Sequence, residues 1–146
     1  MLPKNILVPT DFSESATAAL DYAVELAAKL DARVHVLNVV GVEILGSEYG
    51  ISLTPDLVTM VYAANQKELD RIVAARASQA AFGPAILETG EPRAVIAAVA
   101  TRVAADLIVM GTHGRRGFRR LLVGSVAESV ARTAMCPVLL LRGAVS

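Results

Sequence analysis

Several residue types are scarce in this chain, and each scarcity argues against a class of protein. There is one cysteine, Cys136, so no internal disulfide can form; tryptophan is absent, and aromatic residues make up 4% of the 146 residues. The formal net charge is +0, whereas general nucleic-acid-binding proteins are usually basic overall. No apolar run approaches the ~18 residues needed to span a bilayer. We therefore expect no nucleic-acid partner and no membrane segment.

Signals for export are also missing. The opening stretch MLPKNILVPTDFSES reaches Asp11 after a very short apolar segment and contains no small-residue cleavage site, unlike a secretory signal peptide. A single cysteine fits a reducing compartment. We therefore expect a cytoplasmic protein.

Hydrophobic residues are abundant, at 54%, and they alternate between two patterns. Continuous apolar runs, typical of strands buried on both faces, lie at 5–10, 32–40, 85–90, 106–110 and 136–141. Helical periodicity lies at 11–30, 55–79, 91–105 and 125–134, while residues 41–55 have no clean period. The alternation predicts an α/β fold with a parallel sheet and helices on both faces. The length fits one domain over residues 1–146.

Polar residues at the expected helix starts predict specific caps. Asp11 and Glu14 have the spacing of a capping box, and Ser13 is a second candidate N-cap. Ser125 and Glu128 predict a capping box for the last helix. Among other polar or reactive residues, His35 lies in a buried strand run and is predicted to be a core histidine. Cys136 is expected to be buried at the start of the last strand.

The stretch GTHGRRGFRRLLVGS, residues 111–125, holds four of the ten glycines. Glycine lets backbone N–H groups approach an anion closely, and Gly124 precedes an expected helix N-terminus, where free N–H groups and the helix dipole favour phosphate. Ser125 can donate its hydroxyl and His113 a ring N–H. Further positive charge, suited to phosphate, comes from Arg115, Arg116, Arg119 and Arg120. The stretch is predicted to be a phosphate cradle, although it lacks the Gly-Lys-Ser/Thr ending of a Walker A loop.

The glycine spacing G-x2-G-x9-G-S, formed by Gly111, Gly114, Gly124 and Ser125, resembles the nucleotide-binding pattern of the universal stress protein family. ILVPTDFSE resembles that family's opening strand and turn, GEP its turn after the third strand, and VMGTHGRRG and CPVLLL its fourth and fifth strands. The resemblance covers essentially the whole chain and is weakest over residues 41–55. It implies an open five-stranded parallel sheet in the order 3-2-1-4-5, a Rossmann-like fold of the adenine nucleotide alpha hydrolase-like kind.

The resemblance also implies a site for ATP, with Mg²⁺ as its expected companion ion. The turn after the first strand would touch adenosine, and Asp11 would lie near the ribose or a metal-bound phosphate, which makes it the candidate metal ligand. The implied binding residues are Pro9, Thr10, Asp11, Val39, Gly90, Pro92, Met110, Gly111, Thr112, His113, Gly114, Arg115, Arg116, Gly117, Gly124, Ser125 and Val126.

Three functions are compatible with these residues. The resemblance implies an ATP-binding stress-response protein in which the nucleotide is a regulatory ligand. It also implies a homodimer that pairs the last strand, Val138, Leu139, Leu140 and Leu141, across a two-fold axis. The first alternative is a slow ATPase or autophosphorylating enzyme, for which His113 is the only candidate general base. The second is a nucleotide-free dimeric interaction module, which the intact glycine pattern disfavours.

Overall fold

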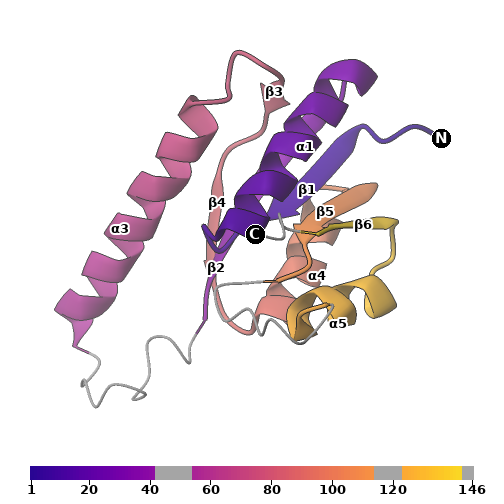
Figure 1. The fold of residues 1–146 in the computed structure, drawn as a ribbon. Coiled ribbons are helices and arrows are strands. Elements are labelled where there is room, and N and C mark those ends of the chain that lie inside the picture. Colours follow the sequence, from indigo (N-terminus) through magenta and orange to yellow (C-terminus); the bar gives the residue numbers. More distant parts are fainter. Residues whose placement is uncertain (42–53, 114–122, 143–146) are drawn as a thin grey trace.

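The computed structural model describes residues 1–41, 54–113 and 123–142. Strands and helices alternate along the chain, as the apolar runs predict, except that the strands at 81–82 and 86–89 follow one another without a helix between them (Figure 1). The strands are β1 (Asn5–Pro9), β2 (Arg33–Val40), β3 (Ala81–Phe82), β4 (Ile86–Thr89), β5 (Leu107–Gly111) and β6 (Val138–Leu141). The helices are α1 (Glu14–Leu30), α3 (Pro55–Ala74), α4 (Pro92–Arg102) and α5 (Ser125–Thr133). The predicted α/β class is confirmed.

The sheet is parallel at every pairing, and β1 lies at its centre. Its order is β3-β2-β1-β5-β6, with β4 also paired to β2. β3 pairs with Arg33 and Val34, and β4 pairs with β2 from Leu37 onward, so both occupy one position in the sheet. The described sheet therefore has six strands instead of the expected five, because the short strand β3 precedes the predicted third strand (residues 85–90), and Gly83 and Pro84 separate it from β4. Counted by position, the expected order 3-2-1-4-5 is confirmed.

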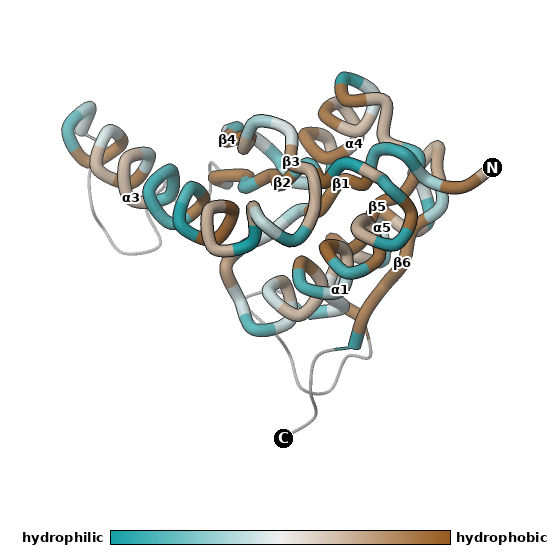
Figure 2. The backbone as a smooth tube through the Cα atoms, turned by 90° about the horizontal axis from the view of Figure 1, so that it is seen from above, coloured by the Kyte–Doolittle hydropathy of each residue, from teal (hydrophilic) through white to brown (hydrophobic). Residues whose placement is uncertain are grey.

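Two apolar layers cover the two faces of the sheet, and successive strand residues alternate between them. Helices α1 and α4 lie on opposite sides of the sheet (Figure 2). The layer under α1 and α3 contains Ile6, Val8, Leu20, Val24, Val34, Val36, Leu69 and Ile72. The layer under α4 and α5 contains Leu7, Leu37, Ile96, Val99, Ile108 and Val130. Within the described ranges, no helix is both long enough and apolar enough to cross a bilayer.

A predicted helix end and a predicted burial are wrong. Helix α3 ends at Ala74 and not near Gln79. The Arg76 guanidinium donates to the carbonyl of Ile72 at 2.8 Å, so a side chain satisfies this last-turn carbonyl after the helix has ended. Cys136 is half-buried in the turn before β6, so its predicted burial at the start of the last strand is also wrong.

Two of the predicted caps are wrong as well, while the second candidate for the first helix, Ser13, is confirmed. Ser13, and not Asp11, caps α1 by accepting from the Ala16 N–H at 3.2 Å. Gly124 occupies the N-cap position of α5, in extended conformation and without a side-chain hydrogen bond. Ser125 is therefore the first helical residue, because a bond between Gly124 and Thr112 outside the helix fixes where α5 begins.

The amino edge of the sheet is held by polar contacts within the protein. His35 is buried, with its Nε2 3.0 Å from Asn5 Oδ1, which confirms its prediction as a core histidine. Its ring also fills the space beside Gly83, where a Cβ would stand 2.6 Å from Nδ1. Burial, and secondarily the charge of Arg33, lowers the pKa of His35. At the same edge Asp106 accepts from two successive backbone N–H groups, those of residues 4 and 5. The side chains of His35 and Asp106 therefore stabilise this edge of the sheet.

Candidate functional site

The strand order reverses direction between β1 and β5, which are hydrogen-bonded neighbours. The chain leaves β1 to form α1 on one face of the sheet, and it leaves β5 to form α5 on the other face. In open α/β sheets the crevice outside the carboxyl ends of the strands, at such a switch point, is where ligands bind. The fold therefore places its most favourable ligand position between the turn after β1 and the segment after β5.

The turn after β1 is fixed by several short hydrogen bonds. The Thr10 N–H donates to the Leu37 carbonyl at 2.8 Å, and Thr10 Oγ1 accepts from the Phe12 N–H at 3.1 Å. Asp11 Oδ1 accepts from the Ser13 N–H at 3.0 Å, which forms an Asx turn. Phe12 has a φ of 66°, a left-handed conformation that is uncommon for a bulky residue. Such strain persists where surrounding contacts enforce it, and it is concentrated at functional sites.

The end of β5 is packed directly against the start of α1. A Cβ on Gly111 would stand 2.1 Å from Ser15 Oγ and 2.8 Å from the Ser15 carbonyl oxygen, so only glycine fits without movement. The Ser15 hydroxyl is buried and has no hydrogen-bond partner within the described part of the chain. This contact brings the first turn of α1 and the end of β5 to one place, and it explains the first glycine of the sequence pattern.

The start of α5 is tied to the end of β5. The Thr112 N–H donates to the Leu141 carbonyl at 2.9 Å, and the Thr112 carbonyl accepts from the Gly124 N–H. A Cβ on Gly124 would stand 3.0 Å from the same carbonyl oxygen, tighter than ordinary contact. Thr112 is buried, and its Oγ1 lies 3.0 Å from His113 Nδ1. The N-terminus of α5 therefore opens at the carboxyl end of β5, where its dipole favours an anion.

The remaining predicted residues are distributed along the same carboxyl edge. Val39 lies near the end of β2, and the Gly90 N–H donates to the Val40 carbonyl at 3.2 Å in the turn after β4. Gly90 has a φ of 147°, which favours glycine. Pro92 is the first residue of α4. Because β4 and β1 flank β2, Gly90 and Pro92 stand two strand positions from the turn after β1.

One predicted residue packs in the core, and four others lie outside the described residues. Met110 is 7% exposed and packs in the layer under α4 and α5, so its side chain serves the core. Four further predicted residues lie outside the described residues: Gly114, Arg115, Arg116 and Gly117. Other predicted residues lie at the ends of β1 and β5 or at the start of α5: Pro9, Thr10, Asp11, Gly111, Thr112, His113, Gly124, Ser125 and Val126.

The chemistry available in the described residues is that of anion binding. No group of three or more His, Cys, Asp or Glu side chains gathers there in a way that could hold a metal ion. Asp11 is a single carboxylate in the turn after β1. Magnesium in nucleotide sites is commonly held by one or two carboxylates together with phosphate oxygens and water. Among the described residues, the single carboxylate of Asp11 therefore fits a metal that is also held by a phosphate ligand.

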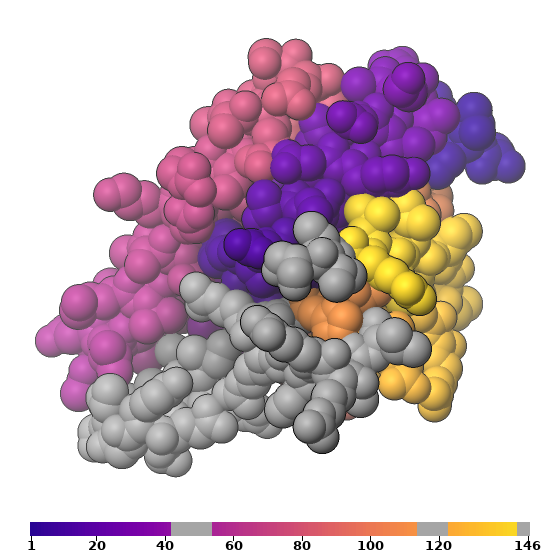
Figure 3. Space-filling view, viewed as in Figure 1, coloured from indigo at the N-terminus to yellow at the C-terminus, as the bar shows by residue number. Residues whose placement is uncertain are grey.

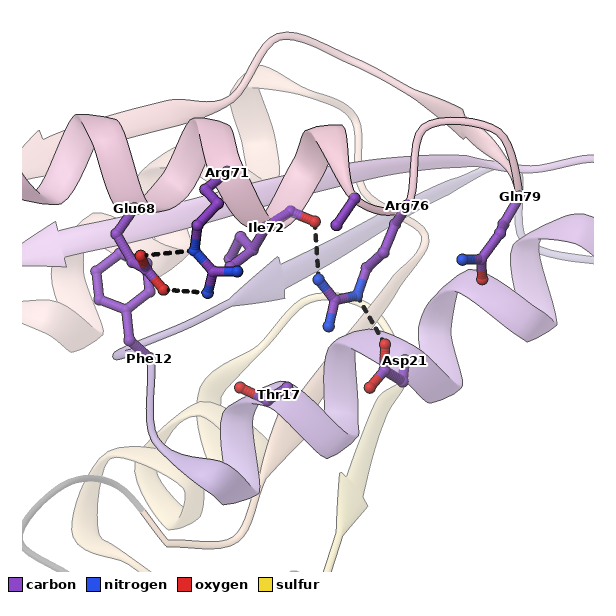
Figure 4. A pocket seen from close by; sticks show the side chains of 9 residues that line it. Phe12, Thr17, Asp21, Glu68, Arg71, Ile72, Arg76 and Gln79 are labelled. Carbon is purple, nitrogen blue, oxygen red and sulfur yellow. Dashed lines mark hydrogen bonds and ion pairs between the residues drawn. The ribbon is translucent and has the colours of Figure 1, made fainter.

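A separate cleft of about 330 Å³ lies between α1 and α3 (Figure 4). Its charged side chains are paired with one another. Arg76 Nε lies 2.7 Å from Asp21 Oδ1, and Arg71 lies 2.6 Å from Glu68 Oε1. The Phe12 ring lines one end of the cleft. The paired charges make this cleft a poorer anion site than the crevice between β1 and β5.

Sequence reasoning missed two residues next to the turn after β1. Asn38 is 3% exposed, and its Nδ2 donates to the Thr10 carbonyl at 2.9 Å. Asn65 of α3 donates from Nδ2 to Asn38 Oδ1 at 3.1 Å. The signal for Asn38 was an amide inside the apolar run VHVLNVV, since a buried amide must find partners. The sequence held no comparable signal for Asn65.

The sheet order, the helices on both faces and a helix N-terminus at the switch point define a doubly wound α/β protein. The profile of the universal stress protein family matches residues 3–142. Universal stress protein MJ0531 of Methanocaldococcus jannaschii is 35% identical over 144 residues, which cover 97% of this chain and 83% of that protein. The chain belongs to the universal stress protein family.

Solved structures agree with this assignment. The structure of hypothetical protein MJ0577 is 27% identical, with 98% of each chain covered and a TM-score of 0.87. A universal stress protein in complex with cAMP is 26% identical, with 99% of this chain and 100% of that chain covered and a TM-score of 0.68. Nucleotide binding thus occurs among the structural relatives of this chain.

Proposed function

We propose that this chain is an ATP-binding universal stress protein in which the nucleotide acts as a regulatory ligand. ATP with Mg²⁺ occupies the crevice between the turn after β1 and the start of α5. Residues 1–146 act as one domain, and the protein works in the cytoplasm. The nearby precedent is the relative in complex with cAMP, which carries an adenine nucleotide on the same fold.

The observation that carries the proposal is the bond between Gly124 and Thr112 at the carboxyl end of β5. It directs the N-terminus of α5 toward the switch point, and the N-cap residue, Gly124, has no side chain that could cap it. The first N–H groups of a helix have no partner within the helix, and phosphate oxygens are suitable acceptors for them. Ser125 is exposed at the first helical position and adds a hydroxyl donor.

We assign the other parts of the nucleotide from the resemblance of the sequence to the family. With the phosphates at α5, the adenosine lies toward β1 and β2, along Pro9, Thr10, Asp11, Val39 and the backbone of Met110 and Gly111. Gly90 and Pro92 border its outer side. His113 and Val126 flank the ribose and phosphates. The loop residues Gly114, Arg115, Arg116 and Gly117 complete the cradle on the strength of the sequence pattern alone.

Asp11 is the residue that would meet Mg²⁺. It is half-buried in the turn after β1, and the bond from Ser13 to Oδ1 fixes its orientation. When bound, Mg²⁺ would neutralise phosphate charge, and Asp11 would supply a protein carboxylate to it. The proposed ion is therefore bound only together with the triphosphate.

The proposal includes a homodimer formed through β6. β6 is an edge strand with a single neighbour, β5, within the described sheet, and all four of its residues, Val138–Leu141, are half-buried apolar side chains. An open apolar edge invites pairing with another chain. Sedimentation velocity tests this part: a species of twice the chain mass supports it, and a monomer at micromolar concentration contradicts it.

Calorimetric titration with a matched pair of variants tests the phosphate end of the site. Ser125→Ala removes the hydroxyl at the start of α5, while Ser129→Ala makes the same change one turn later on the same helix. We expect ATP with Mg²⁺ to bind the Ser125→Ala variant about fivefold more weakly, because one hydrogen bond contributes about 1 kcal/mol. Ser129→Ala should leave affinity unchanged. The absence of binding heat for ATP, AMP and cAMP with the native protein, together with no thermal shift, would contradict the proposed function.

A further inference from the structure

A chain of two amides links α3 to the turn after β1. Asn38 Nδ2 donates to the Thr10 carbonyl at 2.9 Å, and Asn65 Nδ2 donates to Asn38 Oδ1 at 3.1 Å. Asn38 and Thr10 are 3% and 6% exposed, so water does not compete for these groups. The structure thus connects Asn65 of α3 and Asn38 of β2 to Thr10, the residue that follows β1, through one hydrogen-bonded path, which we call the amide relay (Asn65, Asn38 and Thr10).

The direction of the amide relay is fixed by the chemistry of its members. The Thr10 carbonyl can only accept, so the nitrogen of the Asn38 amide must face it. Asn38 then presents its oxygen to α3, and Asn65 must supply a donor there. An acceptor at position 65 would leave one oxygen of the path facing another oxygen. Either order of the Asn38 amide would then leave one contact unmatched.

The amide relay sets the orientation of a peptide group in the proposed site. In a trans peptide the C=O and N–H bonds point in opposite directions within one plane. Holding the Thr10 carbonyl toward Asn38 therefore also fixes the direction of the Asp11 N–H and the start of the Asp11 side chain. The Phe12 N–H bond to Thr10 Oγ1 and the left-handed Phe12 backbone follow in the same turn.

The amide relay meets α3 where the helix leaves the body of the protein. The buried residues of α3, Leu69 and Ile72, lie in its C-terminal half. None of residues 54–64, all of which the structure describes, is buried. In the space-filling view α3 reaches beyond the end of α1 (Figure 3). Asn65 is thus one turn before the first buried residue of the helix. Its hydrogen bond to Asn38 therefore depends on the position of α3.

We propose that Asn65 is a positioning residue that, through Asn38, fixes the Thr10–Asp11 peptide and so couples the position of α3 to nucleotide affinity. The inference rests on the proposed nucleotide site for its functional consequence. Displacing α3 breaks the amide relay and weakens nucleotide binding. By linkage, bound nucleotide favours the docked position of α3 to the same extent.

The test replaces the Asn65 amide, which donates a hydrogen bond, by a carboxyl, which donates only when it is protonated. Asn65→Asp places a carboxyl against Asn38 Oδ1; ionised, it accepts only, and protonated, it donates again. Burial and the facing oxygen raise the pKa of such a carboxyl above the ordinary value of about 3.9. Gln66→Glu is the matched control, because it makes the same amide-to-carboxyl change on the next residue. The Gln66 amide bonds along α3 to Asp70.

Calorimetric titration with ATP and Mg²⁺, at about pH 7.5 and about pH 5, gives the first readout. We expect Asn65→Asp to bind about tenfold more weakly than the native protein at the higher pH, as for a lost buried hydrogen bond. The difference in affinity between Asn65→Asp and the native protein should become smaller at the lower pH, because the carboxyl is protonated there. Gln66→Glu should stay within about twofold of the native protein at both values. Equal affinity for Asn65→Asp, or a deficit that does not change with pH, would overturn the inference.

Amide NMR of Asp11 and Phe12 gives a second readout that needs no nucleotide. Their signals should shift in Asn65→Asp, return at low pH, and stay unchanged in Gln66→Glu. If the native protein binds no nucleotide, the proposed function fails, and these signals alone decide whether the amide relay positions the turn; unshifted signals would overturn it. If Asn65→Asp does not fold, Asn65→Leu replaces it. Weaker binding or shifted signals in that variant support the amide relay, and native values for both overturn it.

Discussion

Gly111→Ala is the substitution whose loss of folding stability follows most directly from the structure. The new Cβ would stand 2.1 Å from Ser15 Oγ and 2.8 Å from both the carbonyl carbon and oxygen of Ser15. The hydroxyl can rotate away, but the Ser15 backbone belongs to the first turn of α1, so the helix start and β5 must separate. Overpacking of this kind costs about 1–3 kcal/mol. We expect a value near the upper end, because backbone atoms cannot yield by changing rotamer.

Urea unfolding at equilibrium measures this cost. We expect Gly111→Ala to lower the midpoint without changing the slope, which reports a loss of stability and not a change in the unfolded state. Ser15→Ala alone removes a buried hydroxyl that has no partner within the described residues, so its stability should equal or exceed the native value. The double variant should recover less than half of the loss, since the backbone contacts remain. A Gly111→Ala variant within about 0.5 kcal/mol of the native protein would refute this reasoning.

Three further predictions concern charged and titratable groups. Asp11→Asn should weaken ATP binding with Mg²⁺ and leave binding without Mg²⁺ nearly unchanged; equal loss in both titrations would contradict its metal role. The folded-state pKa of His35 is lowered by burial and by Arg33, so the unfolded chain binds the proton more readily. Stability should therefore decrease as pH falls below about 6.5, and denaturation of His35→Gln should lack that decrease. Burial and the charge of Asp106 raise the pKa of the Cys136 thiol, so iodoacetamide at about pH 8 should react more slowly with it than with a free thiol; an equal rate would contradict this.

The order of elements and the location of the crevice could be predicted because they follow from local patterns. Apolar runs such as NILVP are long enough to mark buried strands, and the alternation with helical periods leaves few topologies. The short strand β3 before the predicted third strand was not anticipated, and Gly83 and Pro84 separate it from β4. Proline lacks the N–H that a continuous strand needs, and the His35 ring fills the space beside Gly83.

Details set by long-range contacts could not be read from the sequence. Ser125 has the local pattern of an N-cap, but the bond from Gly124 to the Thr112 carbonyl fixes the helix start one residue earlier. Asn65 sits on a helix with ordinary polar neighbours, and its partner Asn38 is 27 positions away along the chain. Periodicity reports which face is buried, and it does not report which polar groups meet across elements.

Thermal unfolding with ATP and Mg²⁺, with AMP and without ligand tests the central claim most directly. It is run on the native protein and on Gly124→Val, whose side chain would crowd the Thr112 carbonyl where α5 begins. At 100 times its Kd, a ligand that binds only the folded state adds about 2.7 kcal/mol, which raises Tm by several degrees in a chain of this size. We predict that rise for the native protein with ATP, a smaller rise with AMP, and little change for a folded Gly124→Val variant. An equal rise in both proteins would place the nucleotide elsewhere, and no rise in either would contradict nucleotide binding.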